Sequence, residues 1–335
     1  MAKDNGNGAA GLDRMLVLEV ARVTEAAALA AARFCGRGNE KAADKAAVDA
    51  MRYELSRVSL RGTVVIGEGE MDEAPMLYIG EEVGNGTGPE VDIAVDPLEG
   101  TTICAKRMPN ALAVLAISER GGLLHAPDMY MNKIAIGPGY PEGVVDLDAP
   151  VADNLAALAK VKGVPVSAIT ACLLDRPRHA EIIRAVREAG AGVQLIPDGD
   201  IAGVIWTTDP DETGIDIYLG SGGAPEGVLA AAALRCIGGQ IQGRLMPSND
   251  DETARARKMG ITDIKKKFTL EDMASADVIF AATGVTSGSL LEGVKFRGGM
   301  AETETLIMRS KTGTVRRIKS RFRDVGKHLL ADTRD

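Results

Sequence analysis

The stretch Val91–Thr102 (VDIAVDPLEGTT) carries two carboxylates at a spacing that suits a hard cation. Apolar and polar residues alternate along its first half, which predicts a strand that delivers Asp96 at its end and is stopped by Pro97. Asp96 and Glu99 then flank a tight turn, and Gly100 opens a helical turn with unpaired N–H groups. Carboxylates on one side and N–H donors on the other are a layout for a metal-bound phosphate. Asp-Pro and Glu-Gly are also common in surface turns, so the stretch alone leaves that alternative open.

A second group of acids follows a short apolar strand that the sequence predicts over 63–66. Four carboxylates fall within six positions, at Glu68, Glu70, Asp72 and Glu73. Like charges at this density cost free energy unless they are solvated, paired or bound to cations. Because they emerge from the end of an apolar strand, we interpret them as cation ligands in preference to a solvated loop.

Three further loops, each after a predicted strand, carry groups suited to a sugar phosphate. They are Asp175–His179 (DRPRH), Asp198–Asp200 (DGD) and Gly220–Gly227 (GSGGAPEG). A basic cluster could bind a second phosphate, a pair of Asp side chains could accept hydrogen bonds from sugar hydroxyls, and glycines let the backbone approach an anion. Glu226 would repel an anion directly, yet it could bind a metal that holds one. Each loop also has a plainer interpretation as a helix-start charge pair or a glycine-rich turn, and the third lacks a Walker A ending.

The candidate acids and loops can act together only if helices and strands place them close to one another, at the ends of the strands. Helices are predicted over 13–34, 42–59, 74–83, 180–189 and 226–236. Strands are predicted over 111–117, 132–136, 169–174, 193–196, 215–219, 277–283, 304–309 and 315–318. In the second half strands alternate with helices, which predicts parallel strands with right-handed crossovers and a site at their carboxyl ends.

Several local details carry expectations of their own. Asp13 is expected to cap the first helix, and Asp44, in the first turn of the second, is most simply a residue that complements the helix dipole. Gly121-Gly122 is expected to join the strands on either side of it as a hairpin. The basic residues between Arg316 and Arg323 suit a solvated or subunit-facing surface, with substrate contact as the alternative.

Composition narrows the classes of function. The formal net charge of −8 argues against general nucleic-acid or membrane binding. No run of about 18 apolar residues appears and the N-terminus has no signal-peptide core, so we expect a cytoplasmic protein, with residues 1–11 disordered. The four cysteines, without a C-x-x-C motif, suit reduced and mostly buried thiols. The three histidines are too few and scattered for a zinc site, which leaves carboxylates, hydroxyls and metal for any catalysis.

As a set, the motifs resemble class II fructose-1,6-bisphosphatase over nearly all of the chain, from about Arg14 to Arg321. They are GRG-x-x-x-A-A-D (36–44), VIGEGEMDEAPMLYIGEEVG (65–84), VDIAVDPLEGT (91–101), NALAVLA (110–116), APDMYMNK (126–133), DRPRH, IPDGD, GSGGAPEG and ATGVTSGSLLEGV (282–294). The D-P-x-E-G-T element alone would indicate only the wider superfamily of lithium-sensitive sugar and inositol phosphatases.

The resemblance implies an α/β fold with α-β-α-β-α layers and two mixed sheets. It implies a metal-binding catalytic lobe over 12–160 and a sugar-phosphate-binding lobe over 161–335. The implied reaction is hydrolysis of the 1-phosphate of fructose 1,6-bisphosphate to fructose 6-phosphate, in gluconeogenesis or sugar-phosphate carbon metabolism, by a homo-oligomer (dimer or tetramer). Three alternatives stay open: a dual fructose-1,6-/sedoheptulose-1,7-bisphosphatase, an inositol-phosphatase-like enzyme, and a non-catalytic protein that binds sugar phosphates.

Site residues follow from the resemblance position by position. The family's metal-binding acids match Asp44, Glu68, Asp96, Glu99 and Glu226. Its catalytic threonine matches Thr101, and Asp72 matches an acid implicated in catalysis. Substrate contacts match Gly100, Thr101, Tyr130, Arg176, Pro177, Arg178, Asp198, Gly199, Asp200 and Gly223. One departure concerns the residues after GRG, where the family often has Asp-Lys and this chain has Asn39-Glu40, with Lys41 one place later.

The residue types themselves define the chemistry. Carboxylate ligands without His or Cys select Mg²⁺ or Mn²⁺ over zinc. Such ions polarise phosphoryl oxygens, stabilise a leaving alkoxide and lower the pKa of a bound water. Thr101 would orient that water or relay its proton, with Asp72 or Glu70 as the acceptor, while the N–H groups at 100–102 would hold the phosphoryl oxygens.

Overall fold

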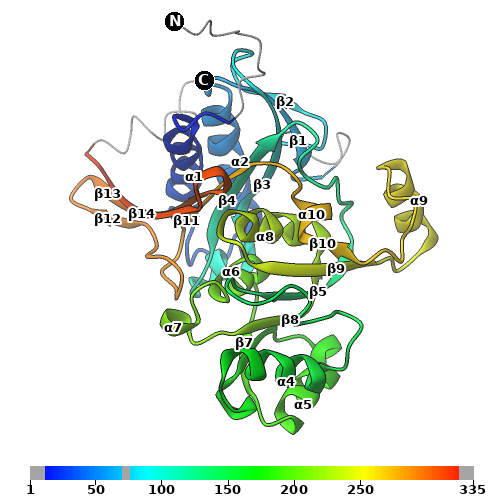
Figure 1. Ribbon diagram of the computed structural model, residues 1–335. Helices are drawn as coiled ribbons and strands as arrows, with labels where there is room; N and C mark the ends of the chain where they lie inside the picture. Colours follow the sequence, from blue (N-terminus) through cyan, green and yellow to red (C-terminus); the bar gives the residue numbers. More distant parts are fainter. Residues whose placement is uncertain (1–11, 70–75, 324–335) are drawn as a thin grey trace, which may run out of the picture.

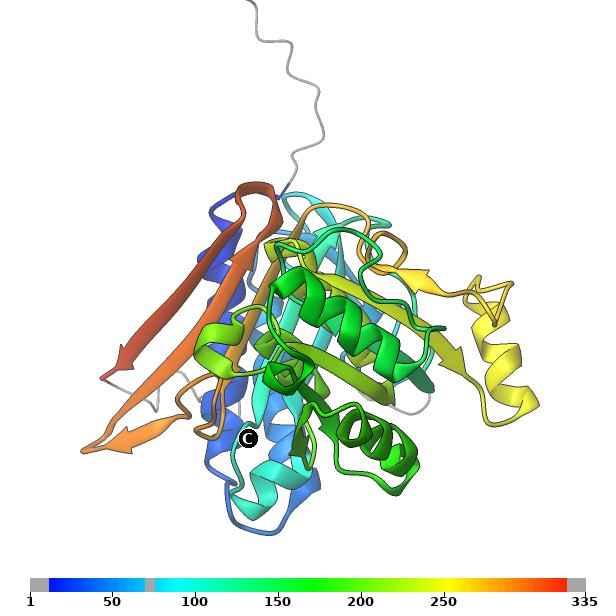
Figure 2. The same ribbon diagram turned by 60° about the horizontal axis from the view of Figure 1, so that its bottom comes forward.

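The computed structural model describes residues 12–69 and 76–323, and two β-sheets form its frame (Figure 1). Residues 1–11, for which the sequence predicts disorder, lie outside these ranges. Helices cover the outer face of each sheet and fill the space between the sheets (Figures 1 and 2). This arrangement confirms the α/β fold with α-β-α-β-α layers and two mixed sheets.

The first sheet joins strands from both halves of the chain. Its order is β12 (Lys295–Arg297), β13 (Met300–Arg309), β11 (Val278–Gly284), β4 (Leu112–Glu119), β3 (Glu90–Glu99), β1 (Arg61–Ile66) and β2 (Glu82–Val83), with β14 (Thr314–Phe322) paired to β13. β1 and β3 run parallel, and the other neighbours are antiparallel. β4 and β11 are buried along nearly their whole length, because helices cover both faces of the sheet.

The second sheet is built from the middle of the chain. Its order is β10 (Phe268–Thr269), β9 (Gln240–Met246), β5 (Tyr130–Ile136), β8 (Ile217–Gly223), β6 (Thr170–Leu174) and β7 (Gly192–Ile196). β6 runs parallel to both β7 and β8, which confirms the predicted parallel run. The pairs that involve β5 and β9 are antiparallel, so this sheet is mixed too.

Five layers of elements enclose three apolar clusters. α1 (Leu16–Ala32) and α2 (Glu40–Leu55) cover the first sheet, and α4 (Val151–Lys162) and α5 (Ala180–Glu188) cover the second. Between the sheets lie α6 (Asp200–Trp206) and α8 (Ala224–Ile237). The smaller elements are α3 (Thr101–Lys106), α7 (Pro210–Thr213), α9 (Asp250–Lys258), α10 (Leu270–Met273) and the 3₁₀ turns Val166–Ala168, Pro177–His179 and Ser310–Thr312.

The sequence of α8 explains its central position. Ten of its residues are buried, and most of them are alanine or other small apolar residues. A helix that is apolar on all sides is stable only when it is covered on all sides. The small side chains let both sheets approach α8 closely, so the Glu226 carboxylate in its first turn lies between the two sheets.

Sheet membership does not follow the two lobes expected from the sequence. β5 belongs to the second sheet although it precedes residue 160, and β11 to β14 belong to the first sheet although they follow it. The division at 12–160 and 161–335 therefore stays a prediction about function. Within the described ranges, no helix has the length and apolar character needed to cross a membrane.

Some local predictions are wrong. Residues 76–83 form turns and the short β2 instead of a helix, and Leu77 there takes a positive φ of 54°. Gly121-Gly122 does not make a hairpin, because β4 and β5 lie in different sheets and the chain crosses from one to the other at this point. Asp13 is not the cap residue of α1, although its Oδ1 accepts a hydrogen bond from the N–H of the true cap, Met15, at 2.9 Å.

Candidate active site

Asp96 and Glu99 lie in an irregular stretch at the end of β3. Asp96 is opposite Val114 of β4. Glu99 is opposite Leu112, so β3 carries one more residue than β4 between the two pairs. The prediction that Pro97 ends the strand is wrong, since the bulge accommodates it. Side chains three positions apart on a regular strand point to opposite faces, and the extra residue brings these two carboxylates to the same side.

The turn after β3 leads directly into α3. Gly100 takes a left-handed conformation (φ 83°, ψ 56°) that other residues adopt only with strain. Its carbonyl accepts a hydrogen bond from the N–H of Cys104 at 2.9 Å, which closes the first helical turn. Thr101, the first residue of α3, is partly buried and lies two positions after Glu99. The predicted helical turn at 100–102 is therefore confirmed.

Glu226 reaches the same place from the second sheet. It lies in the first turn of α8, directly after β8, and a Cβ atom at Gly223 would be only 1.8 Å from its Oε2. A side chain at this position would displace the carboxylate, so glycine allows Glu226 to keep its place. Among the described residues, Asp96, Glu99 and Glu226 are the group of acids whose oxygens all lie within 4.8 Å of one another. Within the described residues, Oε2 of Glu226 is buried and has no hydrogen-bond partner.

Burial and mutual repulsion raise the pKa values of these acids. Loss of hydration raises the pKa of Glu68 to about 8, and the charges of Asp44 and Asp96 add to this rise. Loss of hydration likewise raises the pKa of Asp96 to about 6 and that of Glu226 to about 7. Burial, with the charge of Asp96 as the next cause, raises the pKa of Glu99 well above its ordinary value. A bound cation would favour the charged forms and reverse these shifts.

The five acids expected to bind metal belong to one electrostatic cluster. Asp44 is the fifth residue of α2, because the helix begins at Glu40, so the expectation that Asp44 lies in the first helical turn is wrong. Glu68 follows β1, and its N–H donates to the carbonyl of Leu77 at 3.0 Å. Burial raises the pKa of Asp44 as well. Asp44 and Glu68 are outside the close group of three acids, yet the charge of Asp44 raises the pKa of Asp96, and the charge of Asp96 raises the pKa of Glu68.

Lys133 is a buried cation that sequence reasoning missed. Its side chain is 1% exposed in the centre of β5, and it forms an ion pair with Asp200. Nζ of Lys133 also donates to the carbonyl of Gly223 at 2.8 Å. Its charge opposes the rise in the pKa of Glu226. The signal in the sequence is that Lys133 directly precedes the apolar residues at the end of a strand. A lysine is uncommon at a buried position unless it has a buried partner.

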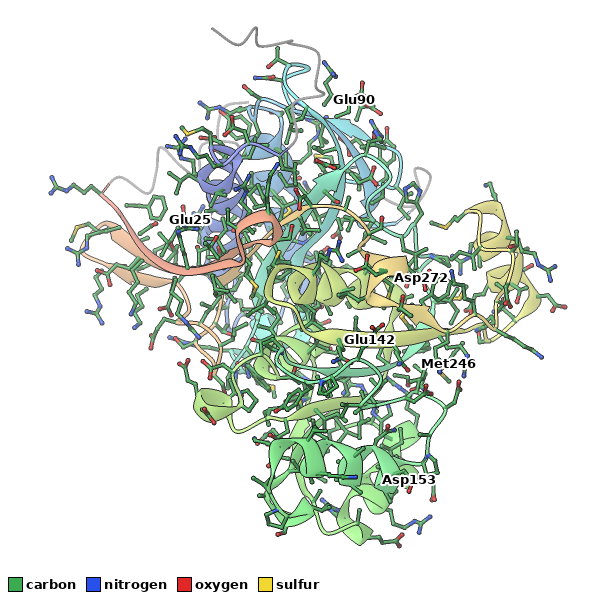
Figure 3. All side chains as sticks on the ribbon, viewed as in Figure 1. Glu25, Glu90, Glu142, Asp153, Met246 and Asp272 are labelled. Atoms are coloured by element: carbon green, nitrogen blue, oxygen red, sulfur yellow. The ribbon has the colours of Figure 1, made fainter. Side chains whose placement is uncertain are left out.

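The expected sugar-phosphate groups are also brought together, at the ends of β5, β6 and β8. Arg178 donates from Nε to Oγ of Ser221 at 3.0 Å and from Nη2 to the Ser221 carbonyl at 2.8 Å. Its guanidinium lies 4.6 Å from the ring centroid of Tyr130. Tyr130 is 51% exposed and is paired with Met246, which Figure 3 labels. The local sequence alone favours a core position for Tyr130, with solvent or a ligand as the alternatives for its hydroxyl, and its exposure shows that the core expectation is wrong.

A buried histidine supports this basic loop. Nδ1 of His179 lies 2.8 Å from the carbonyl of Leu174, and the N–H of Ser221 donates to Nε2 at 2.8 Å. Burial lowers the pKa of His179, so the neutral ring holds Ser221 in place under Arg178. Sequence reasoning gave His179 no such role.

The loop at Asp198–Asp200 lies next to Arg176. Arg176 donates to the carbonyl of Pro197 and lies 3.7 Å from Asp198 as an ion pair. Gly199 takes a left-handed conformation (φ 86°), and its N–H donates to Oδ1 of Asp198 at 3.2 Å. Pro177, exposed, begins the short 3₁₀ turn that leads into α5.

Other expected residues are placed as follows. Glu70 and Asp72 lie outside the described residues. Asn39 caps α2, since its Oδ1 accepts from the N–H of Ala42 at 3.0 Å. Glu40 begins the helix, and Lys41 is exposed.

Comparisons with known proteins point to one family. A family model described as bacterial fructose-1,6-bisphosphatase, glpX-encoded, matches residues 14–322. The fructose-1,6-bisphosphatase 1 class 2 of Escherichia coli (strain K12) is 50% identical over 321 residues, which cover 92% of this chain and 95% of the relative. The class 2 fructose-1,6-bisphosphatases of Escherichia coli O6:H1 and Shigella flexneri match with the same identity and coverage.

Proposed function

The chain belongs to the glpX-encoded bacterial fructose-1,6-bisphosphatases, and on this premise we propose that it hydrolyses the 1-phosphate of fructose 1,6-bisphosphate to fructose 6-phosphate and phosphate. The observation that carries the proposal is the match over residues 14–322, which includes every proposed site residue. We further propose that the enzyme acts in the cytoplasm, in gluconeogenesis or related sugar-phosphate metabolism, as a homo-oligomer. Its four free thiols suit a reducing compartment.

We assign the metal site to the acids at the junction of the two sheets. Two observations support a cation here. Among the described residues Oε2 of Glu226 has no hydrogen-bond partner, and burial raises the pKa values of Glu68 and Glu226. The donor set consists of carboxylates alone, which favours Mg²⁺ or Mn²⁺. Asp96, Glu99 and Glu226 would hold the cation, with Asp44 and Glu68 completing the set. When bound, the cation would supply charge that polarises the phosphoryl group and stabilises the leaving oxygen.

The proposed reaction then uses Thr101 at the start of α3. The hydroxyl of Thr101 orients the attacking water and passes its proton onward. Asp72 or Glu70, which lie outside the described residues, accepts that proton. Backbone N–H groups at Gly100 and Thr101 contact the phosphoryl oxygens, because they follow Glu99 directly in the chain at the start of α3.

The second sheet supplies the proposed contacts to the rest of the substrate. Arg176 and Arg178 offer positive charge for the phosphate that is not cleaved, and the exposed ring of Tyr130 lies beside them. Sugar hydroxyls would bind at Asp198, Gly199, Asp200 and Gly223, while Pro177 shapes the arginine loop. Asp200 is already paired with Lys133, so its sugar contact uses the acceptor capacity that the ion pair leaves.

One experiment tests the proposed function. Phosphate release is measured from fructose 1,6-bisphosphate, sedoheptulose 1,7-bisphosphate and inositol phosphates, each with Mg²⁺, Mn²⁺ or EDTA. We expect fast release from fructose 1,6-bisphosphate with a divalent cation and none with EDTA. Comparable release from sedoheptulose 1,7-bisphosphate would show the dual enzyme. Preference for inositol phosphates, or no release from any substrate, would contradict the proposal.

A further inference from the structure

Two cysteines from distant parts of the chain lie in contact beside the proposed site. Sγ of Cys35, just after α1, is 3.3 Å from Sγ of Cys104 in α3. Cys104 is fully buried, and Cys35 is partly exposed. Both are free thiols, and nothing in the proposed phosphatase mechanism uses either of them.

The backbone around the two thiols holds them in a fixed relation. The N–H of Gly36 donates to the carbonyl of Cys104, and the N–H of Gly38 donates to the carbonyl of Ala105, both at 3.0 Å. These bonds attach the segment after α1 directly to α3. The sulfur contact is therefore part of a built junction between two segments, rather than a chance approach of two flexible side chains.

The electrostatics give the two sulfurs different roles. The hydrogen bond with Cys104, together with the positive charge of Arg107, lowers the pKa of Cys35 below its ordinary value. The same hydrogen bond and burial raise the pKa of Cys104. By contrast, burial raises the pKa of both Cys172 and Cys236 to about 12. Cys35 is thus the thiol that combines exposure with thiolate character, the two properties that control oxidation.

We propose that Cys35 and Cys104 form an oxidation site that closes to a reversible disulfide with hydrogen peroxide, and that the disulfide slows the phosphatase. The Cys35 thiolate attacks one peroxide oxygen, the O–O bond breaks, and the released hydroxide takes a proton to leave as water. Cys35 is now a sulfenic acid. The sulfur of Cys104 then attacks it, the S–S bond forms, the S–O bond breaks, and the thiol proton leaves with the hydroxide as a second water. Two thiols are oxidised by two electrons and one peroxide is reduced; a dithiol reductant reverses the step by exchange.

The positions of Cys35 and Cys104 are the reason to expect that the disulfide slows turnover. This part of the inference rests on the proposed function. A disulfide bond is about 2.0 Å long, so the sulfurs must approach by about 1.3 Å from their 3.3 Å separation. Cys104 lies three residues after Thr101 in the same short helix. Cys35 lies four residues before Asn39, the cap of the helix that carries Asp44. Closure therefore pulls on both segments, and a displacement of about 1 Å at a reacting group costs about 10²-fold in rate.

The first test concerns the disulfide itself and does not depend on the function. The purified protein is treated with increasing hydrogen peroxide, alkylated after unfolding and digested with trypsin, which cuts after Arg33, Arg37, Arg61 and Lys106 and so separates the two cysteines. We expect a peptide pair joined through Cys35 and Cys104. Cys172 and Cys236 are internal controls that should remain alkylated. A different pairing, or over-oxidation of Cys35 without a disulfide, would overturn the proposal.

The second test concerns turnover. Phosphate release is measured for wild type and Cys35→Ser before oxidation, after it, and after dithiothreitol. We expect wild type to lose about tenfold or more and to recover with dithiothreitol, whereas Cys35→Ser stays constant. Cys104→Ala should instead give a Cys35 sulfenic acid that dimedone traps. A wild-type disulfide without loss of turnover, or equal loss in Cys35→Ser, would refute the regulatory role. No activity in reduced wild type would refute the proposed function alone, since the peptide map is read separately.

Discussion

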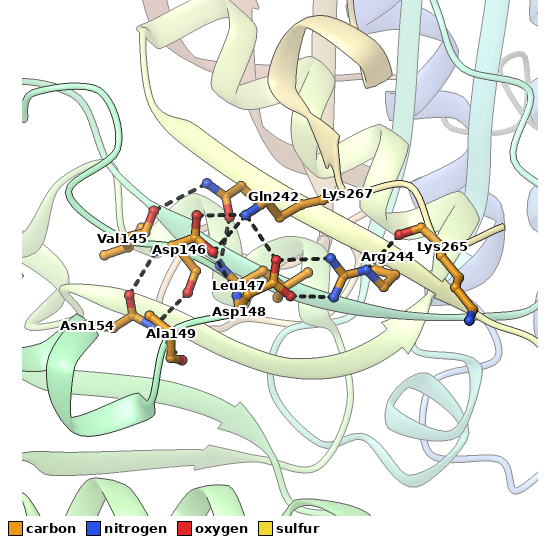
Figure 4. Close-up of polar contacts among 10 residues, drawn as sticks. All are labelled: Val145, Asp146, Leu147, Asp148, Ala149, Asn154, Gln242, Arg244, Lys265 and Lys267. Atoms are coloured by element: carbon orange, nitrogen blue, oxygen red, sulfur yellow. Dashed lines mark hydrogen bonds and ion pairs between the residues drawn. The ribbon is translucent and has the colours of Figure 1, made fainter. Parts of the chain in front are cut away.

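The protein contains two clusters of acidic side chains that are built in opposite ways. In the loop after β5, Asp146 and Asp148 each meet a cation (Figure 4). Nζ of Lys267 lies 2.7 Å from both oxygens of Asp146, and Arg244 reaches both oxygens of Asp148 at 2.5 and 3.1 Å. Hydrogen bonds from Arg244 and Lys267 lower the pKa of Asp148 to about 2. At the proposed active site, burial has moved the pKa values in the other direction.

This contrast separates a structural cluster from the proposed metal site. The Asp146–Asp148 loop is also held by Gln242, whose Oε1 accepts from the N–H of Leu147 at 2.7 Å, so its charges serve to fix the connection between β5 and α4 (Figure 4). The site acids are more buried, and among residues 12–69 and 76–323 they have no such fork of cations; the buried Lys133 is paired with Asp200 instead. Buried charges without partners are costly, and a cation from solution would remove that cost.

The two clusters should differ most in activity when one carboxylate charge is removed from each. Asp96→Asn takes a carboxylate from the cluster that needs a cation, so we expect kcat/KM to fall by about 10³-fold or more while the fold is kept. Asp148→Asn is the matched control, which should keep full activity and lower Tm by no more than a few degrees. Phosphate release and melting curves measure both. Equal losses of activity in the two variants would erase the distinction between the clusters.

Thr101 tests whether the neighbouring turn is chemical or structural. If its hydroxyl positions the water and relays the proton, Thr101→Ser should keep much of the activity. The near-isosteric Thr101→Val should lose roughly 10²- to 10⁴-fold in kcat, about 3–5 kcal/mol of barrier, with a much smaller change in KM. A helix-start role would instead cost Thr101→Val about 1 kcal/mol of stability and leave turnover intact. Steady-state kinetics and melting curves on the two variants decide between them.

The sequence predicted the residues of this site better than the path between them. Asp96, Glu99 and Glu226 could be recognised because the sequence places each at or just after the end of a predicted strand, and the ends of strands in an α/β sheet meet at one edge. Their approach to one another depends on the bulge at Pro97, which is set by the pairing of β3 with β4 and not by local propensity. Local reasoning treated the proline only as a stop signal.

Errors elsewhere have the same long-range origin. Gly121-Gly122 has good turn chemistry, but the choice between a hairpin and a crossing to another sheet depends on which strands pair. Lys133 could not be assigned a role because its partner, Asp200, lies 67 positions further along the chain. Tyr130 was treated locally as core, whereas its position at the end of β5 exposes it beside Arg178.

A smaller effect should appear in the pH dependence of stability. Glu68 has a folded pKa of about 8 against an ordinary value of 4.5, so the folded state binds more protons between these pH values. Without a divalent cation, stability should therefore fall as pH rises through that window. Asp148 contributes in the opposite sense, since its stabilisation is present above pH 3.8 and is lost as pH falls toward its folded pKa of about 2.

Melting curves between pH 5 and about 8.5 test this difference. With EDTA, Tm should decline toward high pH by several degrees; with Mg²⁺ the decline should flatten, because the cation favours the charged carboxylates. Glu68→Gln should reduce the slope in EDTA, while Asp148→Asn should leave it unchanged in this range. A slope that neither Mg²⁺ nor Glu68→Gln alters would mean that the site acids do not control it.

The smallest expected effect lies at the edge of the site, where the family resemblance leads us to expect Asp-Lys and this chain has Asn39-Glu40, with Lys41 one place later. Asn39 caps α2, and Lys41 is exposed. Burial is the main cause that raises the pKa of Asp198, and the charge of Glu40 adds to that rise, so Glu40 is electrostatically coupled to the substrate loop.

We therefore expect this protein to work without an amine at this position. Glu40→Ala and Lys41→Ala should each change kcat/KM by less than about threefold, around 0.6 kcal/mol. If Lys41 instead replaced the family lysine, Lys41→Ala alone would cost far more activity. Steady-state kinetics on the two single variants separate these cases, and severe losses from both changes would contradict either one.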